Sequence, residues 1–251
     1  MANYRLDLQY EGTRYDGWQK QGNTKNTIQG RLETLLGEYC KEEIALIGSG
    51  RTDAGAHAAG QVANFHTTKK LDEEALRDYL NDHLPGDIGV TKVQAVEEAF
   101  HARHHASQKV YVYRVWNSRV KNVLEGRYLF QSPEELDLEQ MKQAAAHLVG
   151  THDFRSFCAN GRMKKSTVRT VFSIDIQRLG EEVRLTFCGN GFLYNMVRMM
   201  AGTLLQVGEG KLLPEEMPSI LEQKNRQAAG VTLPAKGLLL QSVSYGDSPK
   251  S

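Results

Sequence analysis

The stretch Gly48-Ser49-Gly50-Arg51-Thr52-Asp53-Ala54-Gly55-Ala56-His57 lies between two apolar runs, residues 44–47 and 61–66. Both runs are short and bounded by glycine, which is typical of strands. Three glycines within eight positions let the backbone turn tightly and approach other groups closely. The pattern predicts a loop between two strands that presents the Asp53 carboxylate beside Arg51. The alternative is that Asp53 only forms the turn and Arg51 is solvated.

The residues around this loop predict a strand at 4–10, a helix at 27–40, a second helix around 71–80 and a strand at 88–96. Asn26-x-x-Gln29 has the form of a capping box for the first helix. Leu84-Pro85-Gly86 is expected to end the second helix. With the two strands flanking the Asp53 loop, the order is strand, helix, strand, strand, helix, strand.

The second half of the chain is expected to repeat this order. Asp137-x-x-Gln140 opens a predicted helix that Gly150 ends. The other predicted elements are strands at 109–116, 168–179, 182–188 and 238–245 and helices at 193–207 and 214–224.

Each half thus has the β-α-β-β-α-β order of a ferredoxin-like unit. We expect an α+β protein in which the mixed, mainly antiparallel sheets of the two halves meet at a central cleft. The expected domains are residues 1–104, which carry the Asp53 loop, and residues 105–251, which complete the cleft.

Composition indicates an ordinary globular protein of 251 residues, with 40% apolar and 24% charged residues. The first ten residues contain Arg5 and Asp7, so we expect no signal peptide. Membrane association is not expected, since no apolar run is long enough to span a bilayer. Three widely spaced cysteines, Cys40, Cys158 and Cys188, favour a reduced, cytoplasmic protein.

The net charge of +1 does not by itself indicate a nucleic-acid partner, but the distribution of charge does. No acid lies between Glu98 and Glu125, or between Asp153 and Asp175. The ten cations in these two stretches are Arg103, Lys109, Arg114, Arg119, Lys121, Arg155, Arg162, Lys164, Lys165 and Arg169. They are expected to contact phosphates, unless acids from elsewhere in the fold neutralise them.

Other chemistries have weaker signatures. The histidines His101, His104 and His105 lack the spacing of a metal site, so we expect no metal and read the segment as a solvated edge or a phosphate contact. Gly189-Asn190-Gly191 lies between a predicted strand and helix, where phosphate often binds, but lacks the lysine of a P-loop. Asp53 has no evident carboxylate partner for glycosidic hydrolysis.

Four segments resemble the TruA family of tRNA pseudouridine synthases. They are Gly50-Arg51-Thr52-Asp53-Ala54-Gly55-Ala56-His57, Lys109-Val110-Tyr111-Val112-Tyr113-Arg114, the segment from Gly189-Asn190-Gly191 through Arg198 to Gly202, and Lys236-Gly237-Leu238-Leu239-Leu240. They span nearly the whole chain. The resemblance implies the pseudouridine synthase fold, without a cofactor, and conversion of uridine to pseudouridine in the anticodon stem-loop of tRNA, at family positions 38–40. It also implies a homodimer in which one tRNA contacts both subunits.

The resemblance further implies roles for individual residues. Asp53 would be the catalytic residue, Tyr111 would lie against the target base, and Arg198 would pair with Asp53. Leu238 would line the pocket, and Arg51 would assist Asp53 or hold the flipped nucleotide. Tyr111 is also a candidate, by position only, for the base that removes the C5 proton.

From the residues alone, simpler interpretations stay open. A tyrosine in a valine-rich strand usually packs in a sheet, and an arginine on an apolar helix usually extends to solvent. A non-catalytic RNA-binding protein of the ferredoxin-like, RNA-recognition-motif type is the alternative function, with Tyr111 and Tyr113 stacking on bases. Against that alternative, the RNA-binding signature of such modules is absent, and the charged Asp53 loop would have no role.

Overall fold

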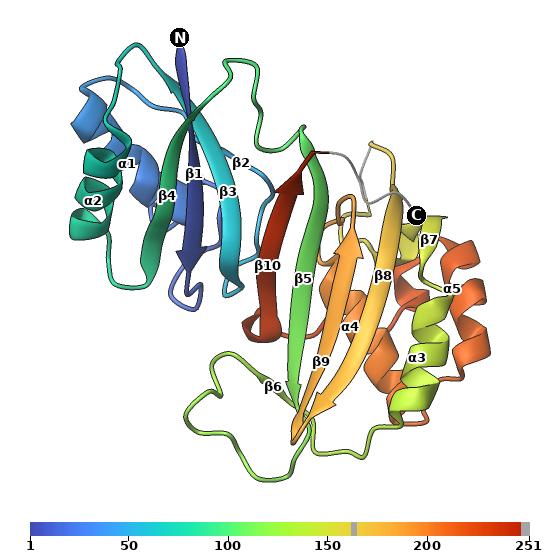
Figure 1. The fold of residues 1–251 in the computed structure, drawn as a ribbon. Helices are drawn as coiled ribbons and strands as arrows, with labels where there is room; N and C mark the ends of the chain where they lie inside the picture. The colour runs from blue at the N-terminus through green and yellow to red at the C-terminus, as the bar shows by residue number, and fades with distance from the viewer. Residues whose placement is uncertain (162–164, 247–251) are drawn as a thin grey trace. The chain divides into compact units, whose positions relative to one another are not determined.

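The computed structural model describes residues 1–161 and 165–246 (Figure 1). The chain divides into two compact units, and the division passes through the last strand. Unit 1 contains Met1–Ser107 and Leu240–Ser251, and unit 2 contains Gln108–Leu239.

Unit 1 has a sheet with the strand order β4-β1-β3-β10, and the short β2 pairs with β3 (Figure 1). Its elements are β1 (Ala2–Tyr10), α1 (Ile28–Cys40), β2 (Ile47–Gly48), β3 (His57–Thr67), α2 (Glu73–His83), β4 (Ile88–Val96) and most of β10 (Leu238–Tyr245). β1 runs antiparallel to both β3 and β4, with Leu6 opposite Ala63 and Val93. These three side chains are buried because alternate residues of a strand face the same side of the sheet.

The helices α1 and α2 cover one face of this sheet (Figure 1). Leu32 and Leu36 of α1 and Leu76 and Leu80 of α2 are completely buried, as their helical spacing predicts. The expected capping box is wrong: the N-cap of α1 is Thr27, whose hydroxyl accepts a hydrogen bond from the backbone N–H of Gly30.

The glutamine of that expected box has another role. Its side chain donates to Leu46 O and accepts from the backbone N–H of Lys20. The expected strand at 44–47 is also largely wrong, because only Ile47 and Gly48 pair with β3.

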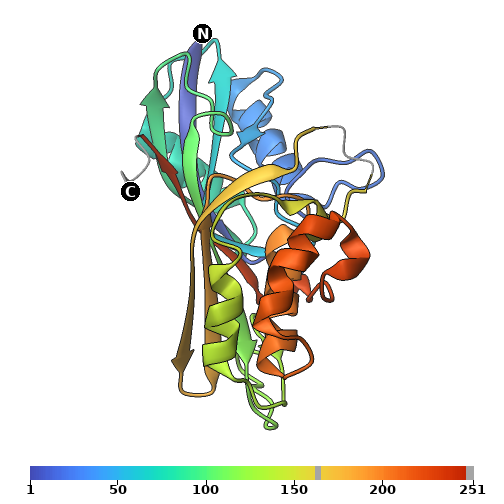
Figure 2. The same cartoon turned by 90° about the vertical axis from the view of Figure 1, so that its right-hand side faces the viewer.

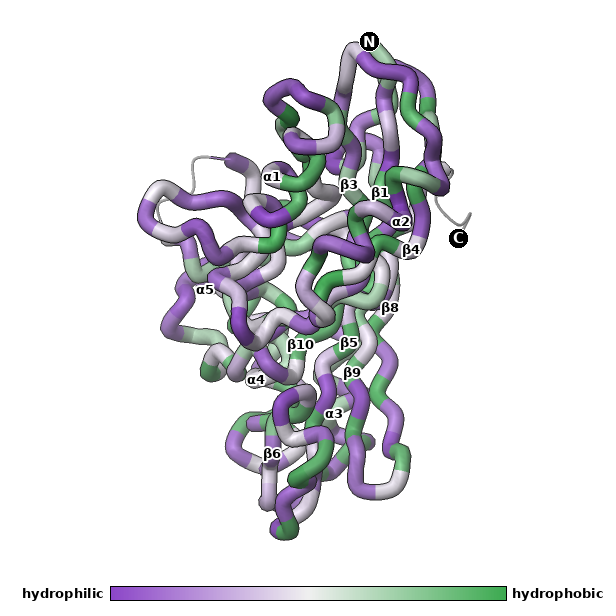
Figure 3. Tube along the Cα trace, turned by 90° about the vertical axis from the view of Figure 1, so that its left-hand side faces the viewer, coloured by the Kyte–Doolittle hydropathy of each residue, from purple (hydrophilic) through white to green (hydrophobic). Residues whose placement is uncertain are grey.

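Unit 2 has the strand order β5-β9-β8-β7, with β6 paired to β5. Its strands are β5 (Ala106–Trp116, which begins in unit 1), β6 (Phe130–Gln131), β7 (Gly150–Asp153), β8 (Val168–Leu179) and β9 (Glu182–Gly189). The pairs β5–β9, β8–β9 and β7–β8 are antiparallel, and β5–β6 is parallel. The β8–β9 hairpin alternates hydrophobic and hydrophilic residues along its length (Figure 3), as expected for a sheet with one buried face.

The helices of unit 2 lie together on one face of its sheet (Figure 2). They are α3 (Leu138–Ala146), α4 (Met196–Gly208) and α5 (Met217–Gln223), with four 3-10 turns at Phe154–Phe157, Pro214–Glu216, Arg226–Ala228 and Ala235–Gly237. The Asp137 cap is confirmed, since its carboxylate accepts from the N–H groups of Glu139 and Gln140.

Two expected helix ends are wrong. α3 ends at Ala146, and Gly150, with φ +114°, begins β7 instead of ending the helix. The expected helix at 214–224 begins as a 3-10 turn, because Pro218 would lie in the interior of an α-helix that starts at Pro214 and lacks the N–H group needed there; in α5 it falls in the first turn, where proline is tolerated.

The expected α+β class is confirmed: antiparallel strands predominate, and helices cover them. Residues 1–107 of unit 1 have the predicted element order, but unit 1 also contains most of β10, which was expected in the second half. Unit 2 has two strands that were not predicted, β6 and β7, so the exact repeat of that order is wrong. Both are short, four residues or fewer, which leaves too little alternation to detect in sequence.

Candidate active site

The Asp53 loop occupies residues 49–56 of unit 1, between β2 and β3. Backbone hydrogen bonds hold it at its start and in its middle: Ser49 N donates to Val62 O at 2.7 Å, and Trp18 N donates to Thr52 O at 3.1 Å. Asp53 O accepts from Ala56 N at 3.1 Å, which closes the turn. The loop is therefore fixed by the sheet and by the connection that follows β1.

A buried hydrogen-bond network lies under the loop. The hydroxyl groups of Tyr10 and Thr52 are 2.7 Å apart, and Gln61 Nε2 donates to Tyr10 Oη at 3.3 Å and to Gly50 O at 3.1 Å. Ser49 Oγ donates to Gln61 Oε1 at 2.6 Å. Burial raises the pKa of Tyr10 to about 12, although its bonds to Thr52 and Gln61 act in the opposite direction. Tyr10 therefore stays protonated at neutral pH.

Two glycines of the connection after β1 allow it to approach the loop. A Cβ atom on Gly12 would lie 1.9 Å from Ala56 O. A Cβ atom on Gly17, whose φ is +91°, would lie 2.9 Å from Thr52 O and 3.3 Å from the carbonyl carbon of Asp53. No sequence pattern assigned a supporting role to residues 11–26, and the two glycines were the available signal for it.

Asp53 and Arg51 both lie on this loop but differ in exposure. Asp53 is partly exposed, whereas Arg51 is exposed and donates from Nε to Gln19 Oε1 at 3.0 Å. His57, just beyond the loop, is buried, and its Nδ1 accepts from Gly12 N at 3.1 Å. The loop thus presents one carboxylate and one accessible guanidinium on a rigid support.

Unit 2 carries Tyr111, in the middle of β5. The residue is buried, opposite Phe187 of β9, and its ring meets the ring of Phe192 edge to face with centroids 5.3 Å apart. Tyr113 is completely buried, and its hydroxyl donates to Pro234 O at 2.8 Å. A stacking platform made of Tyr111 and Tyr113 is therefore excluded in this unit, because the ring of Tyr113 is not accessible.

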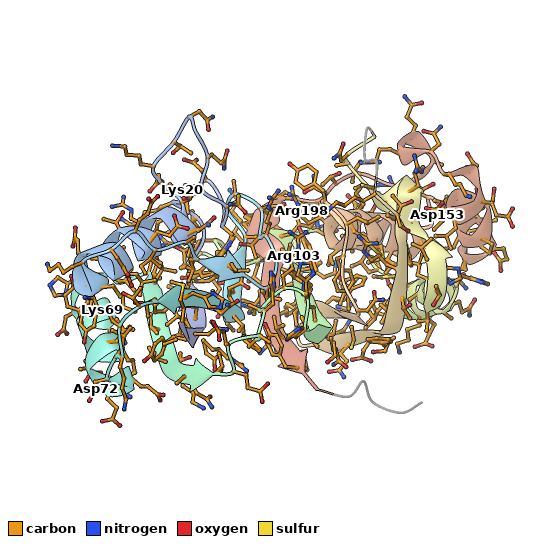
Figure 4. All side chains as sticks on the ribbon, turned by 90° about the horizontal axis from the view of Figure 1, so that it is seen from above. Lys20, Lys69, Asp72, Arg103, Asp153 and Arg198 are labelled. Atoms are coloured by element: carbon orange, nitrogen blue, oxygen red, sulfur yellow. The ribbon has the colours of Figure 1, made fainter. Side chains whose placement is uncertain are left out.

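Arg198, which is labelled in Figure 4, lies on the first turn of α4. Its Nε donates to Leu233 O at 2.7 Å and its Nη1 donates to Asn195 Oδ1 at 2.8 Å. Asn195, the N-cap, adopts a left-handed conformation with φ 61°. The guanidinium is thus only partly exposed and is held by two neutral acceptors, so it does not simply extend into solvent.

Leu238 begins β10 and is buried. The residue before it, Gly237, packs on Tyr113: a Cβ there would lie 2.8 Å from Cζ of that ring. Because Arg198 binds Leu233 O and Tyr113 binds Pro234 O, the segment leading to Leu238 is tied to both α4 and β5. In unit 2, Arg198 and Tyr113 are therefore both joined to the segment 233–238 by hydrogen bonds.

The basic stretches are only partly available for phosphate. Arg114 binds both carboxylate oxygens of Glu182, at 2.8 and 2.9 Å, so it is neutralised as the alternative interpretation allowed. Arg103, Arg119, Lys121, Arg155 and Lys165 are exposed, Lys109 and Arg169 are partly exposed, and Arg162 and Lys164 lie outside the described residues.

The remaining sequence candidates have structural roles. His101 Nδ1 accepts from the N–H groups of Arg103 and His104, at 3.1 and 3.2 Å. Within residues 1–161 and 165–246, no group of three or more histidines, cysteines or acids is arranged to hold a metal ion.

Gly189-Asn190-Gly191 does not lie at a helix N-terminus, since α4 begins only at Met196. In the same part of the chain, no helix has the length and apolar character to cross a membrane.

Comparison with known proteins gives consistent matches. The family model described as tRNA pseudouridine synthase matches residues 8–105 and 144–246. A protein named tRNA pseudouridine synthase A 2, from Bacillus cereus, is 44% identical over 98% of this chain and 100% of its own length. Proteins named tRNA pseudouridine synthase A from Acetivibrio thermocellus and Caldicellulosiruptor bescii are 42% and 43% identical with the same coverage.

A solved structure, of a Cbf5-Nop10-Gar1 complex, contains a chain that matches at 13% identity with a TM-score of 0.37. The match covers 80% of this chain and 45% of that chain. This similarity is too low to support a statement about fold or function.

Proposed function

This chain belongs to the tRNA pseudouridine synthase family, and on that premise we propose which role each site residue has in the reaction. The protein is an isomerase that converts uridine in tRNA to pseudouridine. The observation that carries this conclusion is the match of whole chains: relatives at 42–44% identity are covered from end to end.

We propose Asp53 as the catalytic residue. It is the one acid of the Asp53 loop, and it is partly exposed on a segment held by Trp18, Val62 and the buried network under the loop. A reacting carboxylate has to be held within a fraction of an ångström of its productive position, so a rigid support of this kind favours the role. Arg51, on the same loop, is proposed to hold the flipped nucleotide.

The reaction exchanges one glycosidic bond for another. The bond between N1 and the ribose breaks, the base turns, and C5 bonds to the ribose; the proton that C5 loses is balanced by the one that N1 gains. No group is added or removed, so the proposal includes no cofactor. We propose that Arg198 supplies the positive charge that pairs with the Asp53 carboxylate in this reaction.

Tyr111 and Leu238 are proposed to contact the target base. A uridine in a stem has to be flipped out of the helix, at a cost of a few kcal/mol. Tyr111 is 7% exposed whereas Tyr113 is completely buried, so of these two rings only Tyr111 can contact the base, and such contacts recover about 1–3 kcal/mol. The edge-to-face contact of Tyr111 with Phe192 fixes the ring orientation and supports this role.

The substrate site within tRNA, the assembly and the location are further parts of the proposal. We propose the anticodon stem-loop, at positions 38–40, as the modified region, and a homodimer as the working form. The tRNA substrate and the three cysteines, all free thiols, support a cytoplasmic location.

The Asp53→Asn variant tests the catalytic proposal. We expect no pseudouridine when tRNA transcript is incubated with this variant, while tRNA affinity stays within about tenfold of wild type. The matched control is Asp175→Asn, which removes an exposed acid from β8 and is expected to retain turnover. Pseudouridine is measured by mass spectrometry of the nuclease digest.

Two results would contradict the proposal. Turnover by Asp53→Asn comparable to that of Asp175→Asn would remove the role of Asp53. Wild-type protein that binds tRNA but forms no pseudouridine would instead support the non-catalytic RNA-binding alternative.

A further inference from the structure

Unit 1 contains a cavity of about 540 Å³ that none of the proposed site residues lines. It lies between the connection after β1, the start of α1 and the end of α2. Its walls are formed by Arg14, Tyr15, Asn26, Arg31, His83, Leu84 and Pro85. None of these residues is an acid, and two are arginines, so the chemistry of the cavity favours an anion.

Arg14 is held in place by an acid that lies behind the lining residues. Its Nε and Nη2 donate to Asp87 Oδ2 at 2.8 and 2.5 Å, and Tyr15 Oη donates to Asp87 Oδ1 at 2.5 Å. Burial acts to raise the pKa of Asp87, but the bonds from Tyr15 and Arg14 outweigh it and hold that pKa below its usual value. Asp87 is thus compensated and only 12% exposed, whereas the Arg14 side chain is 68% exposed.

The other polar groups of the cavity retain hydrogen-bonding capacity. Arg31 donates from Nη2 to Asn26 Oδ1 at 3.4 Å, a long contact that leaves most of the five guanidinium donors available. His83 Nδ1 lies 2.8 Å from Tyr79 O and therefore donates to it, which leaves Nε2 for a ligand. Arg31 is a lightly restrained cation, and Arg14, although paired with Asp87, keeps most of its side chain exposed, unlike Arg114; both lie beside an apolar wall, Leu84 and Pro85.

We propose that this cavity binds phosphate groups of the tRNA backbone, as a subsite separate from the Asp53 loop. The inference rests on the proposed function, which makes tRNA the substrate. Guanidinium groups match phosphate oxygens in geometry and charge and are common in nucleic-acid contacts. The connection that supplies Arg14 also carries Lys20, labelled in Figure 4, which pairs with Glu33 at 3.1 Å, and the exposed Lys25, which precedes the lining residue Asn26.

The test is the salt dependence of tRNA binding. Each cation that contacts a phosphate contributes about one unit to the slope of log affinity against log salt concentration. We expect Arg31→Gln to reduce this slope by about one unit and to weaken binding on the order of tenfold at low salt, with convergence toward wild type at high salt. Arg14→Gln and the double variant extend the series, and the double variant is expected to lose about two units.

Matched controls separate a subsite from a general loss of charge. Arg178→Gln is the control for Arg31→Gln, because Arg178 is also exposed and bonded to an asparagine, Asn117, at 2.9 Å. Arg77→Gln is the control for Arg14→Gln, because Arg77 also pairs with an aspartate, Asp78. Thermal melting of each variant identifies loss of folding, and Arg31→Gln keeps the test decisive if Arg14→Gln is unstable.

The outcomes distinguish this inference from the proposed function. A lower slope for Arg31→Gln with an unchanged slope for Arg178→Gln supports the subsite. Equal slopes for wild type and Arg31→Gln overturn the tRNA subsite. If inorganic phosphate alone then raises the melting temperature of the wild type and not of the variant, the cavity binds free phosphate and not the tRNA backbone. If wild-type protein forms pseudouridine while the slopes are equal, only the subsite fails.

Discussion

The substitution Gly17→Ala tests whether the connection after β1 positions the Asp53 loop. Gly17 has φ +91°, and an added Cβ would lie 2.9 Å from Thr52 O, 3.1 Å from Ala54 N and 3.3 Å from the carbonyl carbon of Asp53. All three are backbone atoms, so relief requires a shift of the loop itself rather than a side-chain rotation.

The expected cost follows from these two features. A left-handed backbone costs a residue with a Cβ about 1–2 kcal/mol, and overpacking costs a further 1–3 kcal/mol. The free energy of unfolding should therefore fall by about 2–5 kcal/mol, and the melting temperature by several degrees for a chain of this length. A displacement of a few tenths of an ångström at Asp53 should lower kcat on the order of tenfold, given that about 1 Å costs on the order of a hundredfold.

Two control glycines separate the contributions. An added Cβ at Gly22, in the same connection, meets nothing within 4 Å, so Gly22→Ala should leave stability and turnover nearly unchanged. Gly180 also has open space but φ +61°, so Gly180→Ala measures the conformational cost alone. Thermal melting gives stability, and single-turnover pseudouridine formation gives the rate. Wild-type stability and turnover in Gly17→Ala would refute the positioning argument.

Two other predictions concern buried polar contacts. Tyr10→Phe removes the hydroxyl that joins Thr52 to Gln61. We expect the free energy of unfolding, measured by denaturant titration, to fall by about 1–3 kcal/mol. In steady-state kinetics we expect kcat to fall by a larger factor than KM changes. Glu182 has a pKa lowered to about 2, because the bonds and charges of Arg114 and Arg184 outweigh the effect of burial. Because the pKa of Glu182 is lower in the folded state, its ionised carboxylate adds on the order of 3 kcal/mol to the free energy of unfolding above about pH 4.5. This contribution is lost as pH falls toward 2. Arg114→Gln should therefore flatten the dependence of melting temperature on pH in this window.

Local pattern was sufficient for much of the secondary structure. The bounds of β4, β8 and β10 coincide with the predicted 88–96, 168–179 and 238–245, because alternation and flanking turn residues define a strand within its own sequence. Elements with a weak local signal were predicted poorly. The run 44–47 is apolar, yet mostly unpaired, and the two residues of β6 carry no detectable period.

For the candidate site, too, features with a local sequence signal were predicted and those without one were not. The motif residues Asp53, Tyr111 and Arg198 were predicted as site residues from sequence and stay a proposal, because each is a specific side chain in a specific local order that resembles one family. The contacts around them were not predicted, since Tyr10 and Thr52, under the Asp53 loop, are 42 positions apart. The pair that neutralises Arg114 was not predicted either, since Arg114 and Glu182 are 68 positions apart. Nothing in the neighbourhood of either residue specifies its partner.

The amino-acid sequence by itself thus determined the family and the principal strands and helices, and it supplied Asp53 as the carboxylate proposed for the chemistry, since each depends on residues close together along the chain. Only the tertiary structure decided that Tyr10, Gln61 and Gly17 support the Asp53 loop, that Arg114 is neutralised, and that Arg14 and Arg31 share a cavity. Those contacts arise when sheet register and chain packing bring distant segments within hydrogen-bonding distance, and the free energy of each depends on burial that no local pattern encodes.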